Sequence, residues 1–316
     1  MRKYLFIFLL IVFLFSFHGF SKPGSGKYFK NSSFIQINDI TLHYRSWTAE
    51  GTHQKGQILL IHGFGGSTFS WEQIAPVLSS YGYQVLAVDV PPFGFSEKRS
   101  EMNGSIGARA QLINELIKNL DSETKWHLVG HSMGGAIAAG MALLDPEQFL
   151  TLNLTAPALF DSLVPGKYNV PFLFKIPGIA SFAGNIAQEW FITHDQIQSM
   201  LESAYGEEPA KEQVEQYYRP LSMEGTSRAI LNNARRAKEP KNLNIGNLHL
   251  PVLAIWGEKD TWVPYQDSKK MLELIPSYEL EIIPNAGHNP METHPDIYLQ
   301  KYLAYLEERR KKRDNK

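Results

Sequence analysis

The sequence predicts an α/β fold in which a mostly parallel central sheet carries helices on both faces. Short continuous apolar runs, typical of strands covered on both sides, lie at 57–64, 84–90 and 125–130. Segments with helical spacing follow them at 70–83, 108–120 and 132–145. This alternation indicates parallel strands joined by helices. The 316 residues, 43% of them hydrophobic, are enough to bury one large core and still carry an insertion.

The other elements follow from the same patterns. An antiparallel hairpin is expected at 34–47, because apolar and polar residues alternate on both sides of the turn-forming pair Asn38-Asp39. Further strands are expected at 149–156, 250–257 and 278–284, with helices at 265–275 and 294–312.

The strand pattern fails between 157 and 247. Three helices without intervening strands are expected there, at 193–206, 207–221 and 224–239. We therefore predict a core built from 22–156 and 248–316, with residues 157–247 inserted as a helical cap. The apolar stretch 171–184, with Trp190 and Phe191, either forms a wall for an apolar substrate or packs the cap against the core.

The first 21 residues have the layout of a secretory signal peptide. Arg2 and Lys3 precede an apolar run at 4–17, and Gly19 and Ser21 supply the small residues before a cleavage site. This run is short for a membrane span, which needs about 20 residues. We expect an exported mature protein; the alternatives are an uncleaved membrane anchor and a buried helix.

Charge and cysteine content exclude several classes of function. The formal net charge of −1 gives no long-range field toward nucleic acid. The absence of cysteine excludes disulfides, a cysteine nucleophile and thiolate metal sites. The basic run at 308–316 is interpreted as a solvated tail, with contact to an anionic surface as the alternative.

The segment 127–140, HLVGHSMGGAIAAG, places several glycines around Ser132 between a strand and a helix. The pattern G-x-S-x-G in this position is the nucleophile elbow, a turn too tight for side chains at Gly130 and Gly134. It lifts the serine above the sheet at the start of a helix. Ser132 is therefore the predicted nucleophile.

A serine hydroxyl needs a base and an orienting acid to become a nucleophile. Asp260 and His288 each follow a predicted strand. Along the chain the three residues come in the order Ser, Asp, His, which is typical of hydrolases with a nucleophile elbow. The carboxyl ends of parallel strands meet at one edge of the sheet, so the three groups can converge. Glu258 and Asp161 remain rival acids.

The oxyanion of an acyl-transfer intermediate needs backbone N–H donors. The N–H of Met133, at the start of the helix, is one candidate. The N–H of Phe64, in the glycine-rich loop 62–66, is the other. We interpret His62 as a residue that braces this loop, with a second base as the alternative.

Taken together, these residues resemble the α/β-hydrolase fold family, in its esterase and lipase branch, from about 34 to 306. Four motifs in order carry the resemblance: HGFGG at 62–66, DVPPFGFS at 89–96, GHSMGG at 130–135, and WGEKD at 256–260 paired with AGHNP at 286–290. Dehalogenases and epoxide hydrolases of similar layout have aspartate at the position of Ser132. Pro92 departs from the family pattern, in which a glycine stands there. Phe93 and Phe95 beside it either line an acyl pocket or pack internally.

The resemblance and the triad residues predict a serine hydrolase that cleaves carboxylic esters through an acyl-enzyme, with no metal or organic cofactor. The expected substrate is a small ester with an apolar acyl or aromatic group. The alternatives are cleavage of amide, peptide or carbon–carbon bonds, or peroxide-dependent chemistry, on the same residues. A non-enzymatic module that binds an apolar ligand is a further alternative.

Overall fold

The computed structural model describes residues 28–51, 54–159, 192–239 and 243–315. The predicted signal peptide lies outside the described residues. So do Asp161, Trp190, Phe191 and the apolar stretch 171–184.

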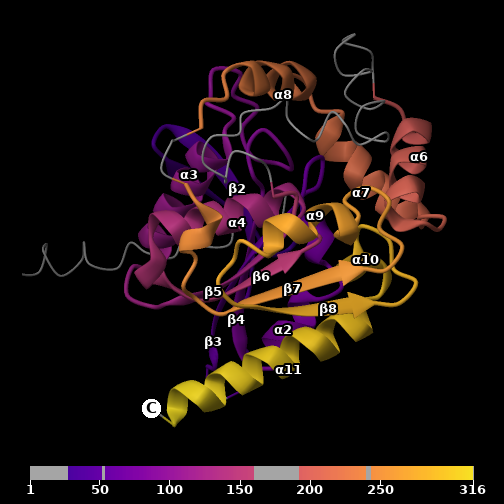
Figure 1. The fold of residues 1–316 in the computed structure, drawn as a ribbon. Helices are drawn as coiled ribbons and strands as arrows, with labels where there is room; N and C mark the ends of the chain where they lie inside the picture. The colour runs from indigo at the N-terminus through magenta and orange to yellow at the C-terminus, as the bar shows by residue number, and fades with distance from the viewer. Residues whose placement is uncertain (1–27, 52–53, 160–191, 240–242, 316) are drawn as a thin grey trace, which may run out of the picture.

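An eight-stranded sheet forms the centre of the molecule (Figure 1). Its strands are β1 (Ser32–Ile37), β2 (Ile40–Trp47), β3 (Gly56–Ile61), β4 (Tyr83–Val88), β5 (Trp126–His131), β6 (Phe149–Thr155), β7 (Val252–Gly257) and β8 (Tyr278–Ile283). They lie in the order β1-β2-β4-β3-β5-β6-β7-β8. The pairs β1–β2 and β2–β4 are antiparallel, and the other five are parallel. The predicted fold class is confirmed.

The hairpin expected at 34–47 is formed by β1 and β2. Asn38 and Asp39 occupy its turn with φ of 46° and 64°. A two-residue turn with both φ values positive matches the twist of the flanking strands, and asparagine and aspartate tolerate this conformation better than most side chains.

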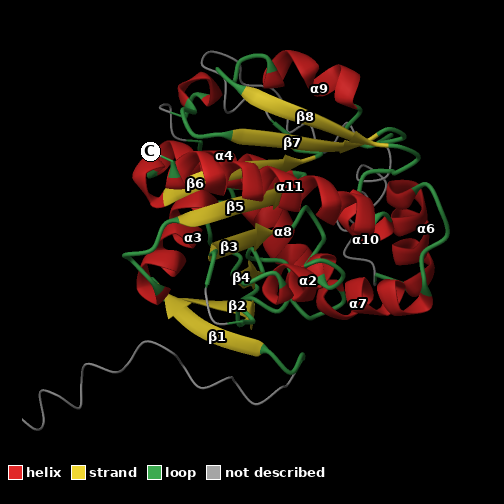
Figure 2. Ribbon diagram, turned by 90° about the horizontal axis from the view of Figure 1, so that it is seen from below, coloured by secondary structure: helices red, strands yellow, loops and turns green. Residues whose placement is uncertain are grey.

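Helices cover both faces of the sheet (Figures 1 and 2). They are α2 (Ala75–Ser80), α3 (Ile106–Leu120), α4 (Met133–Leu144), α9 (Tyr265–Leu272), α10 (Pro290–Thr293) and α11 (Pro295–Asp314), with short 3-10 turns η1 (Thr68–Trp71), η2 (Pro146–Gln148) and η5 (Ile245–Asn247). The prediction of one continuous helix at 70–83 is wrong. The 3-10 turn η1 and the short α2 replace it, because Pro76 suits only the first turn of a helix and α2 therefore begins at Ala75.

The two faces bury separate apolar clusters. In β3, Leu59 and Ile61 pack with α3 and α4, whereas Ile58 and Leu60 pack with α2 and α11. All four side chains are fully buried. This explains why the strand reads as a continuous apolar run: neighbouring side chains point to opposite faces, and both faces are covered.

Between β6 and β7 the chain leaves the sheet. The described part of this excursion holds the helices α6 (His194–Tyr205), α7 (Lys211–Leu221) and α8 (Thr226–Arg235), here called the cap helices, and no strand. Thr193 and Gln196 close the first turn of α6 in a capping box, and Gly206 ends it in a left-handed conformation. In Figures 1 and 2, α6 and α7 lie beyond the carboxyl ends of β7 and β8. Of the helices that the structure describes, none combines the length and the apolar character that a bilayer span requires.

Candidate active site

Ser132 stands on a sharp turn between β5 and α4. Its φ is 51°, a rare value for a side chain other than glycine. A Cβ on Gly130 would lie 2.2 Å from the carbonyl oxygen of Gly134, and one on Gly134 would lie 2.2 Å from that of Ile61. The glycines on both sides of the serine are therefore required by backbone packing, as the sequence pattern predicts.

Backbone hydrogen bonds hold this turn in place. The N–H of Ser132 donates to the carbonyl of Thr155, at the end of β6, over 2.9 Å. The carbonyl of Ser132 accepts from the N–H groups of Gly135 at 2.9 Å and Ala158 at 3.0 Å. The strained residue is thus held by hydrogen bonds to α4 and to the chain at and just after the end of β6, as a persistent strained conformation requires.

The predicted base and acid meet in a buried hydrogen bond. Nδ1 of His288 lies 2.8 Å from Oδ2 of Asp260, and both side chains are almost fully buried. The other oxygen of Asp260 accepts the N–H groups of Trp262 and Val263, each at 2.9 Å. A carboxylate beside Nδ1 favours the tautomer with the proton on Nδ1, so Nε2 of His288 is the ring nitrogen available to accept a hydrogen bond.

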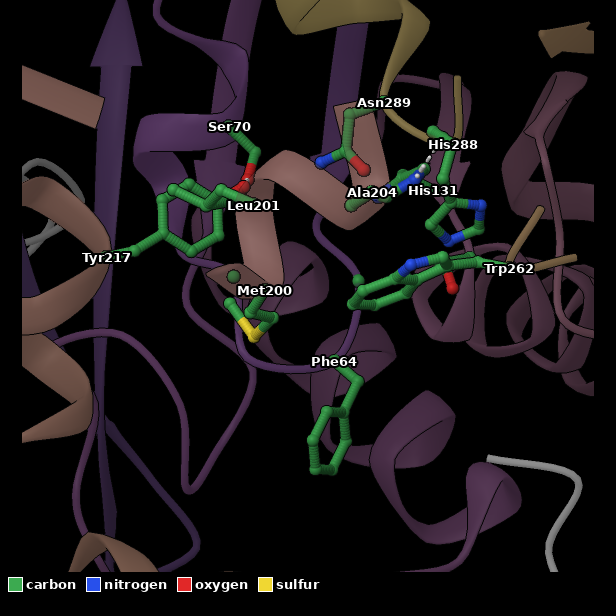
Figure 3. Close-up of a pocket in the computed structure, with 13 residues that line it drawn as sticks. Phe64, Ser70, His131, Met200, Leu201, Ala204, Tyr217, Trp262, His288 and Asn289 are labelled. Atoms are coloured by element: carbon green, nitrogen blue, oxygen red, sulfur yellow. Dashed lines mark hydrogen bonds between the residues drawn. The ribbon is translucent and has the colours of Figure 1, made fainter. Parts of the chain in front are cut away.

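Ser132 and His288 line the same pocket, together with Phe64. Figure 3 shows His288 and Phe64 in this pocket. In the described part of the chain no hydrogen bond joins the Ser132 hydroxyl to His288. Such contacts in hydrolases often form only around a bound substrate.

Glu258, one of the two rival acids, is not hydrogen-bonded to His288. Glu258 is exposed, and its Oε2 accepts the N–H of Asn285 at 3.0 Å. The other rival, Asp161, lies outside the described residues.

Both oxyanion candidates lie beside Ser132. Met133 is the first residue of α4, where N–H groups have no partner within the helix. Phe64 lines the pocket from the loop after β3. A Cβ on its neighbour Gly63 would lie 3.1 Å from Cβ of Ser132, so glycine is what lets this loop approach the serine so closely.

His62 braces the loop before Phe64. Its Nδ1 lies 2.7 Å from the carbonyl oxygen of Gly63, and its Nε2 accepts the N–H of Val90 at 2.9 Å. Burial lowers its pKa, although the carboxylate of Asp89 opposes this effect. With both ring nitrogens engaged, His62 has the bracing position that the sequence suggested.

His131, next to the predicted nucleophile Ser132, was not singled out in the sequence. Its Nε2 donates to the carbonyl of His288 over 3.0 Å, and the two rings lie 4.7 Å apart (Figure 3). Burial, and then the neighbouring His288, hold the pKa of His131 well below its usual value. The residue is therefore a neutral donor that fixes the His288 loop. Its place within G-H-S was the available signal.

The end of helix α6 also holds this loop. Three successive residues bind three positions of the core: Ser203 accepts Nε1 of Trp262 at 3.0 Å, the carbonyl of Ala204 accepts the N–H of His288 at 2.7 Å, and Tyr205 donates to Glu292. Trp262 in turn stacks on the His288 ring, with centroids 5.5 Å apart. The imidazole is thus positioned partly by the cap helices, which no sequence motif indicated.

The remaining pocket walls differ in polarity. Apolar contacts come from Phe64, Trp262, Met200, Leu201 and Ala204, the last three in α6. Polar contacts come from Ser70, Tyr217 and Asn289.

Phe93 and Phe95 pack within the protein and are not among the residues that line this pocket. The ring centroids of Phe93 and Phe64 lie 4.9 Å apart, and those of the stacked rings of Phe95 and Tyr28 lie 3.8 Å apart. The motif at 89–96 that contains them includes a cis peptide bond between Pro91 and Pro92.

Asp89, which opens this motif, belongs to a second Ser-His-Asp arrangement. Nδ1 of His43 lies 2.7 Å from Oδ2 of Asp89, and Nε2 of His43 lies 2.8 Å from the hydroxyl of Ser32. The three side chains are buried, and none lines the described pocket. Among the described residues, no group of three or more histidine, aspartate or glutamate side chains is placed to hold a metal ion.

Comparison with known proteins fixes the family. The family model of the alpha/beta hydrolase fold matches residues 56–295. This chain belongs to the α/β-hydrolase fold family. The matched range runs from the start of β3 to the start of α11, so the cap helices lie within it.

Individual relatives are distant but cover most of the chain. Lipase 3 of Moraxella sp. (strain TA144) is 26% identical over 84% of this chain and 82% of its own length. The 2-hydroxy-6-oxo-6-(2'-aminophenyl)hexa-2,4-dienoic acid hydrolase of Metapseudomonas resinovorans is 27% identical over 81% and 86%. A crystal structure of a membrane phospholipase A, described as a bacterial virulence factor, superposes with a TM-score of 0.72 at 24% identity, covering 98% of this chain and 99% of that one. The chain is thus a hydrolase of this fold, with relatives that act on different bonds.

Proposed function

We propose that this protein is a serine hydrolase that cleaves carboxylic esters, with Ser132 as nucleophile, His288 as base and Asp260 as orienting acid. The observation that carries the proposal is the buried 2.8 Å hydrogen bond between His288 and Asp260, beside a pocket that His288 shares with Ser132. The similarity to Lipase 3 supports an ester as substrate.

The reaction follows from these positions. Nε2 of His288 takes the hydroxyl proton as Oγ of Ser132 attacks the ester carbonyl. The N–H groups of Met133 and Phe64 stabilise the oxyanion. His288 then gives its proton to the leaving alcohol, and an acyl-enzyme on Ser132 remains. Water, deprotonated by His288, releases the acid and restores the serine.

The substrate is proposed to be a small ester with an apolar acyl or aromatic part. Phe64, Met200, Leu201 and Trp262 give the pocket the apolar surface that such a group would cover. The proposed reaction needs no cofactor and no nucleic-acid partner, because the serine, the imidazole and the backbone donors carry out every step.

Covalent labelling by a fluorophosphonate tests the nucleophile, and a panel of esters, amides and carbon–carbon substrates tests the bond. We expect labelling at Ser132 and turnover of p-nitrophenyl esters. Labelling with turnover only of an amide or a β-diketone would replace the ester assignment by the corresponding alternative. If the protein is neither labelled nor active but binds apolar ligands, the remaining interpretation is a non-enzymatic module that binds an apolar ligand.

We further propose that residues 1–21 direct export and are removed, which places the enzyme outside the cytoplasm. N-terminal sequencing of the exported protein should begin at Lys22. A start at Met1 in a membrane fraction would instead support the uncleaved anchor.

A further inference from the structure

One side of the pocket carries three polar side chains, Ser70, Tyr217 and Asn289, here called the polar wall (Figure 3). They come from three distant segments: η1 after β3, cap helix α7, and the residue next to His288. The polar wall therefore exists only where cap and core meet.

A buried carboxyl group organises the polar wall. Glu292 in α10 is 7% exposed and receives three hydrogen bonds. The hydroxyl of Tyr217 donates over 2.6 Å and Nδ2 of Asn289 over 2.8 Å to one oxygen, while the hydroxyl of Tyr205 donates over 2.8 Å to the other. Burial raises the pKa of Glu292, and the donors of Tyr217 and Asn289 oppose this rise. Three side chains from separate segments thus donate hydrogen bonds to this one carboxyl group.

This acceptor fixes the direction of the other hydrogen bonds. Tyr217 has one hydroxyl proton, and it points to Glu292. The 2.9 Å contact between Tyr217 and Ser70 must then use the Ser70 proton, which leaves only lone pairs on Oγ of Ser70. Asn289 likewise turns Nδ2 to the carboxyl group, so its Oδ1 is directed away from it. The polar wall thus offers hydrogen-bond acceptors to a ligand.

The acceptors lie where a leaving group would lie. Asn289 follows His288, whose Nε2 must reach the leaving oxygen in the proposed reaction. Apart from the polar wall and the side chains of His131, Ser132 and His288, the pocket is lined by apolar groups that include Phe64, Met200 and Trp262. An alkyl leaving group would cover the acceptors without satisfying them, which is unfavourable for buried polar atoms.

We propose that the polar wall selects esters whose alcohol part carries a second hydroxyl group, such as monoesters of a diol or polyol, with Ser70 Oγ accepting the hydrogen bond from that hydroxyl. This inference rests on the proposed ester hydrolysis and adds its substrate class. The apolar walls then hold the acyl chain.

A matched pair of substrates tests the selection. In 2-hydroxyethyl octanoate a hydroxyl replaces the terminal methyl group of n-propyl octanoate, with nearly the same shape. We expect the wild-type enzyme to favour the hydroxyl ester in kcat/KM by about 10-fold or more, because a site with buried acceptors rejects an analogue without the donor. Ser70→Ala should bring the ratio to within about 2-fold. Ser203→Ala, which removes one hydrogen bond between cap and core outside the polar wall, should keep the wild-type ratio.

Binding separates this inference from the proposed function. Ser132→Ala cannot form the acyl-enzyme, so titration calorimetry with the two intact esters measures recognition alone. Tighter binding of the hydroxyl ester supports the polar wall even if the wild-type protein cleaves neither ester, an outcome that would refute the proposed function. Equal binding and equal turnover of the two esters, or an equal loss for both in Ser70→Ala, would overturn the inference while ester hydrolysis stands.

Discussion

The described residues hold two Ser-His-Asp arrangements, and of these the one with Ser132 and His288 lines the pocket described above. In the sealed arrangement, His43 links Ser32 to Asp89 through contacts of 2.8 and 2.7 Å. In the pocket arrangement, His288 meets Asp260 at 2.8 Å and shares a pocket with Ser132. The sealed set is the more completely hydrogen-bonded of the two.

The difference lies in what surrounds each serine. Ser32 lies in strand β1, and its Oγ also accepts the N–H of Phe29 at 3.1 Å, with aromatic rings packed around His43. Ser132 stands at the start of α4 with φ of 51°, beside backbone donors and open space. Proximity of the three groups is therefore not enough. A carbonyl must also be able to reach the hydroxyl, with N–H groups beyond it.

Replacing the two serines should give the largest contrast. Ser132→Ala is expected to lower kcat for p-nitrophenyl butanoate by roughly 10⁴- to 10⁶-fold and to leave the fold intact. Ser32→Ala should keep most of the activity and lower the free energy of unfolding by about 1–3 kcal/mol, because Nε2 of His43 loses its partner. Steady-state kinetics and urea unfolding of both variants measure this. A large loss of kcat in a folded Ser32→Ala enzyme would break the distinction.

Replacing Asp260 and Asp89 should give the same kind of contrast between loss of activity and loss of stability, but a smaller one. Asp260→Asn keeps the shape but favours the wrong tautomer of His288, and kcat should fall by about 10⁴-fold. Asp89→Asn should instead lower the free energy of unfolding, by about 3 kcal/mol, because an amide nitrogen would face N–H donors now bound by the carboxylate. Those donors include the N–H groups of Thr68 and Phe95, each at 2.6 Å. Circular dichroism during denaturation, with kcat measured on the folded fraction, distinguishes the two results. An Asp260→Asn enzyme with wild-type kcat would contradict the assigned role.

A buried histidine away from the pocket should affect only the pH dependence of stability. Burial, and then Arg313, lower the pKa of His127 to about 4. Its folded pKa lies below the unfolded value near 6.5. Its contribution to stability is therefore complete above about pH 6.5 and is lost as pH falls toward 4, by up to about 1.4 kcal/mol per pH unit.

His127→Gln should make the unfolding free energy less sensitive to pH between 6.5 and 4, while kcat stays near that of the wild type. Comparison of slopes, with pH 8 as the reference, separates this effect from the packing change caused by the substitution. An unchanged slope would show that His127 is not held neutral in the fold.

Sequence patterns predicted the strands of the sheet, the hairpin and residues that line the pocket, because each of these depends on local rules. Alternation and apolar runs mark strands, and glycines mark the turn at Ser132. The helix expected at 70–83 was misjudged, since periodicity alone did not weigh the proline at 76. The roles of His131 and Trp262 were missed, because both depend on contacts with His288 from across the fold.

The sequence by itself determined the order of elements and the chemical groups at the ends of the strands, since both are written in residue types and spacing. Only the tertiary structure decided which Ser-His-Asp set faces a pocket, and that α6 holds the His288 loop. It also decided that Glu292 lies within hydrogen-bond distance of Tyr217 and Asn289 in the polar wall. These properties arise from contacts between segments far apart in the chain, and their geometry is fixed only when cap helices and sheet pack together.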